Sequence, residues 1–425
     1  MNLRRGFLSL GLRVGAAVLL MSAIPGRADD VGMHVKEATA ITQVFGNGQR
    51  LIAVALEYDR EIDNSRLSEA SFHVEGRTIA KVYANAVASP AEQGKNGKYV
   101  IVDLSPSDPD AALYVQDRMT VKRRKAMALA VQSGPVFTAA GERYEASAHA
   151  FATQKVVNLI VDDFRQLAYE DPKTGNVLNY NLFVPKNYDK NKSYPLVLFM
   201  HDAGVTSSIT DTTLVQGLGA VIWASPAEQV KHEAFVLAPQ YATQMVNDKS
   251  EASSYLDTTV NLIDHLANEF SIDRDRLYTT GQSGGAMMSI AMDIKYPDLF
   301  AASFLVAGQW DPAKVQPLAN DKLWIVVSEG DLKAYPGQNA ITAELEKYGA
   351  RVSRAVWDGR STPKEFEAAV QRMPAENNLI NYVALRKGTV VPPGQVDDGG
   401  SNHVNTWRIA YTIEGIRDWL FKQHR

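Results

Sequence analysis

Cysteine is absent from the 425 residues of the sequence. The chain therefore forms no disulfide and contains neither a thiol nucleophile nor a cysteine ligand for a metal. An H-E-x-x-H zinc motif and a glycine-rich phosphate loop are missing as well, and His201, His232 and His265 do not stand at metal-ligand spacing. The folded state must draw its stability from hydrophobic cores, which a chain of this length can build.

Basic residues are slightly fewer than acidic ones. Internal repeats and low-complexity segments are absent. The sequence has 44 basic and 48 acidic residues, and removal of residues 1–28, with four arginines and no acid, changes the balance to 40 − 48 = −8. An acidic surface argues against nucleic acid and anionic lipid as partners. With 45% hydrophobic and 22% charged residues, the composition is that of a soluble globular protein with two or three domains.

Residues 1–28 have the pattern of a signal peptide. Arg4 and Arg5 precede a short apolar stretch, and small residues follow before Asp29. The paired arginines are typical of a twin-arginine leader, with an ordinary secretory leader as the alternative. The apolar stretch is too short to favour a membrane anchor. We expect an exported bacterial protein, periplasmic or secreted, without stable membrane insertion.

Residues 29–155 predict an all-β domain, because short alternating segments are separated by turn-rich ones. In one segment the alternation is expected to place four side chains on a single face: Ile52, Val54, Leu56 and Tyr58. Several short strands at this spacing favour a β-sandwich. The basic run at residues 122–125 fits a solvated strand edge better than a binding patch.

Residues 156–425 predict a second domain of the α/β class. Residues 164–185 have the pattern of a hairpin, and residues 194–201 form a nearly continuous apolar run, typical of a buried parallel strand. Residues 255–270 carry apolar side chains at helical spacing. Strands that alternate with helices predict a mostly parallel sheet with helices on both faces.

The segment 276–297 is the most informative part of the chain. A short strand pattern leads into Gly281-Gln282-Ser283-Gly284-Gly285, and a helix pattern follows and ends at Pro297. A G-x-S-x-G sequence between a strand and a helix is the signature of a nucleophile elbow. We expect Ser283 to be a nucleophile and the Gly284 amide to face a developing oxyanion.

A nucleophilic serine needs a histidine base and an orienting carboxylate, which follow it along the chain in this fold. Only His403 and His424 come after the elbow, and His424 is the penultimate residue, so the prediction selects His403, in a flexible loop at residues 399–403. For the carboxylate we choose Asp331, which follows a late strand and the turn residue Gly330. The alternatives are Glu329, and more weakly Asp397 or Asp398.

The second oxyanion donor should come from the loop after the strand that ends at His201, and the Ala203 amide is the candidate. Asp202 stands in that loop where a glycine is usual. A carboxylate that faced the oxyanion would raise the barrier, so we expect Asp202 to point away or to be paired. Trp310 and Trp407 are candidates for the substrate pocket, although aromatic residues beside such loops often only pack.

With these residues placed, the chain resembles bacterial esterases of the α/β-hydrolase superfamily that carry an N-terminal immunoglobulin-like domain, related to polyhydroxyalkanoate depolymerases and feruloyl esterases. The resemblance is carried by residues 56–63, 201–204, 281–285, 330–331 and 403–411, and it covers nearly all of the mature chain. It implies carboxylic-ester hydrolysis through an acyl-enzyme, without a metal or organic cofactor. It also implies that the first domain assists assembly, as in a homo-oligomer, or shapes the site.

Three functions follow from these observations. The first is an exported serine esterase that acts on a small-molecule or polymeric ester. The second is a serine peptidase or amidase, because the same three residues serve both reactions. The third is an inactive protein that binds a surface polymer; the order of Ser283, Asp331 and His403 argues against it, and Asp202 argues mildly for it.

Overall fold

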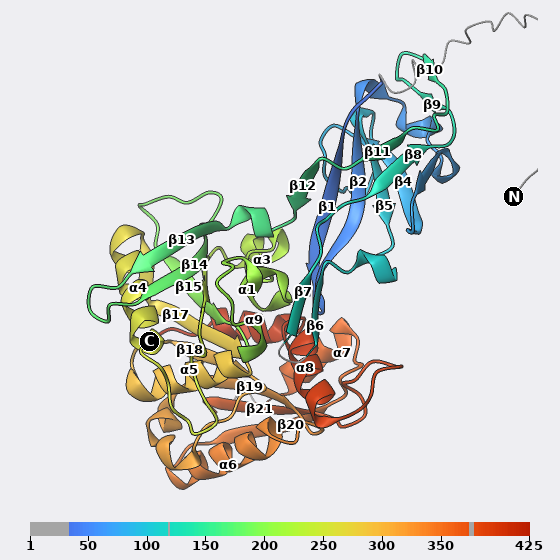
Figure 1. Ribbon diagram of the computed structural model, residues 1–425. Helices are drawn as coiled ribbons and strands as arrows, with labels where there is room; N and C mark the ends of the chain where they lie inside the picture. The colour runs from blue at the N-terminus through green and yellow to red at the C-terminus, as the bar shows by residue number, and fades with distance from the viewer. Residues whose placement is uncertain (1–33, 118–119, 374–377) are drawn as a thin grey trace, which may run out of the picture.

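The computed structural model describes residues 34–117, 120–373 and 378–425. The predicted signal peptide lies outside the described residues. A narrow β-domain stands on a larger domain in which helices surround a central sheet (Figure 1). The two domains meet at one end of the β-domain.

The N-terminal domain is a β-sandwich. One sheet has the order β12-β1-β2-β5-β4 and the other has the order β11-β8-β3. Their bounds are β1 (Val35–Phe45), β2 (Gly48–Ile62), β3 (Phe72–Val74), β4 (Ile79–Asn85), β5 (Gly97–Leu104), β8 (Leu129–Gln132), β11 (Ala150–Ala152) and β12 (Lys155–Asn158). Two small hairpins are β6 (Tyr114–Asp117) with β7 (Thr120–Arg123), and β9 (Val136–Phe137) with β10 (Arg143–Tyr144). The short helices are η2 (Asn64–Arg66), η3 (Glu69–Ser71) and η4 (Pro109–Ala111).

The expected face of β2 is only partly correct. Val54, Leu56 and Tyr58 lie in the core between the two sheets, whereas Ile52 packs with a separate cluster that contains Ala53. The pairing register of β1 and β2 shifts at this point, and the extra residue of a β-bulge interrupts the alternation of faces. Beside this shift, β12 pairs in parallel with β1, so the first sheet continues past residue 155 to Asn158.

The second domain is built on a sheet with the order β13-β14-β16-β15-β17-β18-β19-β21-β20. Its strands are β13 (Arg165–Glu170), β14 (Val177–Phe183), β15 (Tyr194–Met200), β16 (Phe235–Gln240), β17 (Ile272–Gln282), β18 (Ala302–Val306), β19 (Leu323–Ser328), β20 (Val352–Trp357) and β21 (Ile380–Leu385). The antiparallel hairpin β13–β14 agrees with the hairpin prediction, and β15 to β21 are parallel. Every residue of β15 is buried, as expected for a central parallel strand.

Helices cover both faces of this sheet (Figure 1). Their bounds are α1 (Thr212–Val215), α2 (Leu218–Val221), α3 (Pro226–Lys231), α4 (Tyr255–Glu269), α5 (Gly284–Lys295), α6 (Ala334–Lys347), α7 (Pro363–Arg372), α8 (Gly399–Ala410) and α9 (Glu414–Phe421). Single turns add η5 (Val161–Asp163), η6 (Ala203–Val205), η7 (Pro312–Lys314) and η8 (Gln316–Asn320). None of the helices in the described part of the chain is both long and apolar enough to cross a bilayer.

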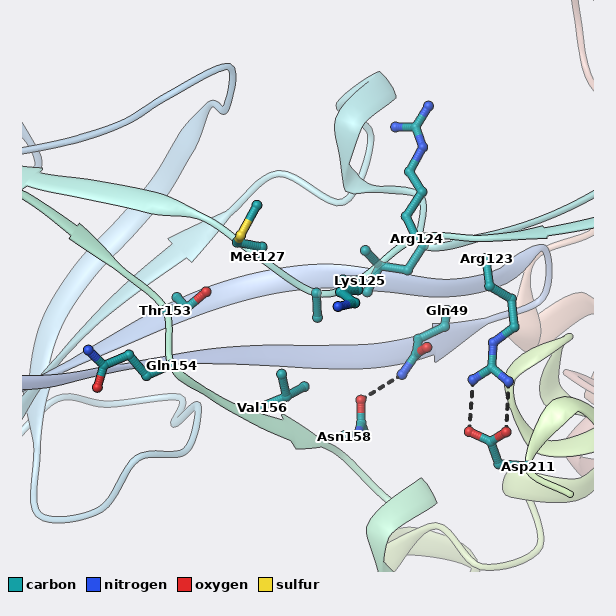
Figure 2. Close-up of a pocket in the computed structure, with 12 residues that line it drawn as sticks. Gln49, Arg123, Arg124, Lys125, Met127, Thr153, Gln154, Val156, Asn158 and Asp211 are labelled. Atoms are coloured by element: carbon teal, nitrogen blue, oxygen red, sulfur yellow. Dashed lines mark hydrogen bonds and ion pairs between the residues drawn. The ribbon is translucent and has the colours of Figure 1, made fainter. Parts of the chain in front are cut away.

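The β1–β2 turn and the β6–β7 hairpin of the first domain contact the second domain (Figure 1). A Cβ at Gly46 would lie 3.2 Å from the Arg408 carbonyl oxygen of α8, so the turn packs closely on that helix. Arg123 of β7 donates two hydrogen bonds, of 2.7 and 2.8 Å, to the Asp211 carboxylate, beside a pocket of about 560 Å³ (Figure 2). Residues 122–125 are exposed, as expected of a solvated strand edge, and Arg123 is in addition paired with Asp211 across the domain boundary.

Candidate active site

Ser283 lies in the turn between β17 and α5, with φ 51° and ψ −116°. This conformation is unfavourable for a residue with a Cβ, and such strain is found mainly where a site depends on it. The flanking glycines are required by contact: a Cβ at Gly281 would lie 2.4 Å from the Gly285 carbonyl carbon, and one at Gly285 would lie 2.0 Å from the Met200 carbonyl oxygen. The turn therefore has the geometry of a nucleophile elbow.

His403 lies within helix α8, which begins at Gly399, so its expected position in a flexible loop is wrong. The side chain of Asp398 accepts a hydrogen bond of 2.7 Å from the Ser401 amide and caps the helix at its start. The imidazole is thus held by a capped helix. His403 Nε2 lies 2.8 Å from Ser283 Oγ, and His403 Nδ1 lies 2.5 Å from Asp331 Oδ2.

Asp331 is 2% exposed and follows β19. Its Oδ1 accepts hydrogen bonds of 2.9 Å from the amides of Lys333 and Ala334, and its Oδ2 faces His403. Burial by itself raises the pKa of Asp331, but the hydrogen bond and charge of His403, together with the two amides, outweigh burial and lower the pKa. An ionised Asp331 accepts a hydrogen bond from the Nδ1–H of His403, which leaves Nε2 unprotonated and able to accept the hydroxyl proton of Ser283.

The alternative carboxylates have other partners. Glu329 Oε2 accepts the Lys387 amide at 3.0 Å, and Asp397 Oδ1 accepts from Asn402 Nδ2 at 2.5 Å. Asp398 caps α8. Of the four carboxylates that the sequence offers, the structure brings Asp331 to His403.

The Gly284 and Ala203 backbones approach each other closely beside Ser283. The Cβ position of Gly284 lies 3.3 Å from the Ala203 amide nitrogen. Gly284 is the first residue of α5, so its N–H lies at the positive end of the helix dipole. Two amides next to a nucleophile are the arrangement that stabilises an oxyanion.

Asp202 is paired, as expected. Its Oδ1 accepts from the Gly204 amide and from Gln116 Nε2, each at 2.9 Å, and its Oδ2 accepts from Gln282 Nε2 at 3.1 Å. The carboxylate is 4% exposed. Its charge is therefore directed at three donors, which removes the main objection to an oxyanion hole in this loop.

The two tryptophans have different surroundings. The Trp407 ring meets the His403 imidazole edge to face, with 5.1 Å between ring centroids. Trp310 is buried and lines a pocket of about 280 Å³ with Leu256 and Ala291, and this pocket contains none of Ser283, Asp331 and His403. Trp407 thus borders the site, whereas the pocket that Trp310 lines is separate from Ser283, Asp331 and His403.

Three residues that sequence reasoning did not select support the site: Gln116, Gln282 and Asn402. A signal existed for Gln282, because a glutamine at the end of a buried strand needs a buried partner. Asn402 precedes His403 and accepts a hydrogen bond of 2.8 Å from Ser328 Oγ, which attaches α8 to the end of β19. Gln116 belongs to the other domain, and no local pattern points from it to Asp202.

The parallel sheet, the elbow and the chain order of Ser283, Asp331 and His403 define an α/β-hydrolase. Within that class, the chain belongs to the esterases with an immunoglobulin-like first domain. Residues 37–145 match the family described as "Esterase Ig-like N-terminal domain", and residues 172–379 match the family described as "Putative esterase".

Two esterases and a depolymerase are among the known proteins that resemble the chain. The crystal structure of a thermostable esterase has a TM-score of 0.79 and 29% identity, and the match covers 92% of this chain and 100% of that one. Acetylxylan esterase A of Emericella nidulans is 31% identical over 18% of this chain and 31% of its own length. Poly(3-hydroxyalkanoate) depolymerase C of Paucimonas lemoignei is 26% identical over 27% of this chain and 28% of its own length. The chain thus spans less than a third of the length of these two relatives.

Proposed function

We propose that the protein hydrolyses carboxylic esters by nucleophilic catalysis at Ser283. The observation that carries the proposal is the continuous hydrogen-bond chain from Ser283 Oγ through His403 to Asp331, with distances of 2.8 and 2.5 Å. This chain lies next to two backbone amides suited to a tetrahedral oxyanion.

In the first half of the reaction, Ser283 Oγ attacks the ester carbonyl carbon while His403 Nε2 takes the hydroxyl proton. The Gly284 and Ala203 amides stabilise the oxyanion, each worth about 3 kcal/mol in the transition state. His403 then gives its proton to the leaving alkoxide, which departs as the alcohol and leaves an acyl-enzyme. Asp331 holds the imidazole in the required tautomer and stabilises the imidazolium.

In the second half, a water molecule replaces the alcohol. His403 Nε2 takes a proton from this water as it attacks the acyl carbonyl, and the same two amides stabilise the second oxyanion. Collapse of the intermediate breaks the bond to Ser283 Oγ, which regains the proton from His403. The products are the carboxylic acid and the free enzyme.

The matches to two esterase families and to the whole chain of a thermostable esterase structure support an ester rather than a peptide substrate. The pairing of Asp202 with Gln116 and Gln282 weighs against an inactive binding protein, because Asp202 was the feature that favoured it. The leader pattern at residues 1–28 supports export to the periplasm or the medium.

The proposal is tested with a fluorophosphonate probe and two substrate classes on the purified mature protein. We expect the probe to label Ser283 in the wild type and not in the Ser283→Ala variant. We expect turnover of p-nitrophenyl acetate and none of peptide p-nitroanilides. Labelling that persists in Ser283→Ala would remove Ser283 from the mechanism, and preference for the anilides would make the protein a peptidase. A series of acyl chain lengths then defines the acyl specificity.

A further inference from the structure

A side chain of the N-terminal domain reaches the loop that carries the Ala203 amide. Gln116 of β6 donates a hydrogen bond of 2.9 Å from its Nε2 to Asp202 Oδ1. The two residues are 86 positions apart and belong to different domains. Asp202 is the residue before Ala203 and caps the turn η6 that begins there. The N-terminal domain is therefore bonded directly to the oxyanion loop.

Asp202 links this loop to the elbow as well. Its Oδ1 accepts the Gly204 amide at 2.9 Å, and its Oδ2 accepts Gln282 Nε2 at 3.1 Å. Gln282 immediately precedes Ser283. The distance between the Ala203 amide and the nucleophile therefore depends on where this buried carboxylate sits.

The Gln116 amide is held in the orientation that this contact needs. The Tyr114 hydroxyl donates a hydrogen bond of 3.2 Å to Gln116 Oε1, which turns Nε2 toward Asp202. Burial, and then the nearby charge of Asp202, raise the pKa of Tyr114, so the hydroxyl keeps the proton that it donates. One face of the β6–β7 hairpin thus presents a preoriented donor to the oxyanion loop.

We propose that Gln116 is a positioning residue for the oxyanion hole, acting through Asp202 on the Ala203 amide. This inference rests on the proposed function, since it requires that Ala203 stabilise an oxyanion. Without Gln116 the carboxylate loses one donor and turns toward its remaining partners, Gly204 and Gln282. Because a displacement of about 1 Å in a catalytic group costs up to about 10²-fold in rate, we expect kcat to fall about 10- to 100-fold.

The effect should fall on the transition state rather than on substrate binding. The oxyanion forms only during the reaction, so we expect the KM for p-nitrophenyl acetate to change little in Gln116→Ala. A trifluoromethyl ketone, which forms a tetrahedral adduct with the serine, should bind more weakly by the same factor by which kcat/KM falls. Phosphonylation of Ser283 by the fluorophosphonate should slow similarly.

Arg123→Ala is the matched control. Arg123 lies on the same hairpin and bonds the second domain through Asp211, not through the oxyanion loop (Figure 2). We expect this variant to keep its kcat and its ketone affinity. Equal losses in Arg123→Ala and Gln116→Ala would assign the effect to domain docking and overturn the inference, as would an unchanged kcat in Gln116→Ala.

Failure of the proposed function has a different signature. If the wild type hydrolyses no ester but is phosphonylated at Ser283, the ester proposal falls. The role of Gln116 is then judged only by the phosphonylation rates of the wild type, Gln116→Ala and Arg123→Ala. If the wild type shows neither reaction, both proposals fall. If the wild type hydrolyses esters and Gln116→Ala has the same kcat as the wild type, the ester proposal stands and the role of Gln116 is rejected.

Discussion

Gly330 lies directly against the side chain of Asn402: a Cβ at position 330 would come within 2.2 Å of the Asn402 amide oxygen. Gly330 precedes Asp331, and Asn402 precedes His403. Asn402 Oδ1 also accepts a hydrogen bond of 2.8 Å from Ser328 Oγ at the end of β19. The close approach of these two residues therefore sets the distance between the carboxylate and the imidazole that it orients.

Gly330→Ala should separate Asp331 from His403. The added methyl group has no space, so α8 or the Asp331 loop must shift, and we expect kcat to fall by about 10²-fold. Gly400→Ala is the control, because a Cβ there would meet only Asp398 Oδ1, at an ordinary 3.5 Å. The measurement is ester turnover with circular dichroism to confirm folding. Equal activity of the two variants would show that the Gly330–Asn402 contact does not position the pair.

Asp331→Asn should leave the fold intact and lower kcat by about 10⁴-fold, as expected when the histidine loses the carboxylate that fixes its tautomer. Glu329→Gln is the matched control, since Glu329 accepts only a backbone amide in this region. We expect that variant to keep wild-type activity. A large loss in Glu329→Gln with a small one in Asp331→Asn would reverse the assignment of the carboxylate.

The parts of the site that the sequence predicts are those with local or ordered signals. The elbow at Ser283 is encoded by contiguous residues. Asp331 and His403 follow from chain order and from the few histidines available. The α/β-hydrolase fold follows from apolar runs such as β15, whose length and continuity indicate a buried parallel strand.

The parts that it does not predict depend on tertiary contacts. Gly399 and Gly400 disfavour a helix, yet α8 begins there because Asp398 caps it and Asn402 attaches it to β19. The bulge that turns Ile52 to the other face of β2 comes from pairing with β1. The hydrogen bond between Gln116 and Asp202 joins two domains, and no periodic pattern in the sequence of either domain predicts it.

Breaking the buried ion pair between α3 and α9 should lower the stability of the protein by a large amount. Glu228 Oε2 accepts from Arg417 Nε at 2.8 Å, and the two side chains are 3% and 8% exposed. Glu228→Gln would leave the Arg417 charge buried with a neutral partner, so we expect a loss of about 3 kcal/mol in the free energy of unfolding. Urea denaturation measures it.

Glu346→Gln provides the comparison for that experiment. Glu346 pairs with Arg354 at the surface, where the two side chains are 43% and 41% exposed. Water screens this pair, and we expect its loss to cost less than about 1 kcal/mol. A similar loss in both variants would mean that burial adds nothing to the Glu228–Arg417 interaction.

Asp321 should make the protein less stable as the pH rises toward neutrality. Burial, together with the charge of Asp298, raises the pKa of Asp321 from 3.8 to about 7. The folded state therefore favours the protonated form. The contribution of Asp321 to the free energy of unfolding is therefore most favourable below the pKa that Asp321 has in the unfolded chain. This contribution falls between about pH 4 and pH 7 and stays low above that range. Asp293 is buried nearby, and burial with the charge of Asp321 raises its pKa in the same direction.

Asp321→Asn removes this titration. Since one pKa unit corresponds to about 1.4 kcal/mol and partial exposure reduces the effect, we expect the variant to be about 2 kcal/mol more stable than the wild type at pH 8 and equal to it at pH 4. Thermal unfolding at the two pH values measures the difference. Asp248→Asn, which removes one partner of an exposed ion pair with Lys333, is the control, and we expect it to change the free energy of unfolding by less than about 1 kcal/mol. A gain for Asp321→Asn that is the same at both pH values would contradict the raised pKa, because an uncharged side chain can then be preferred only for its packing.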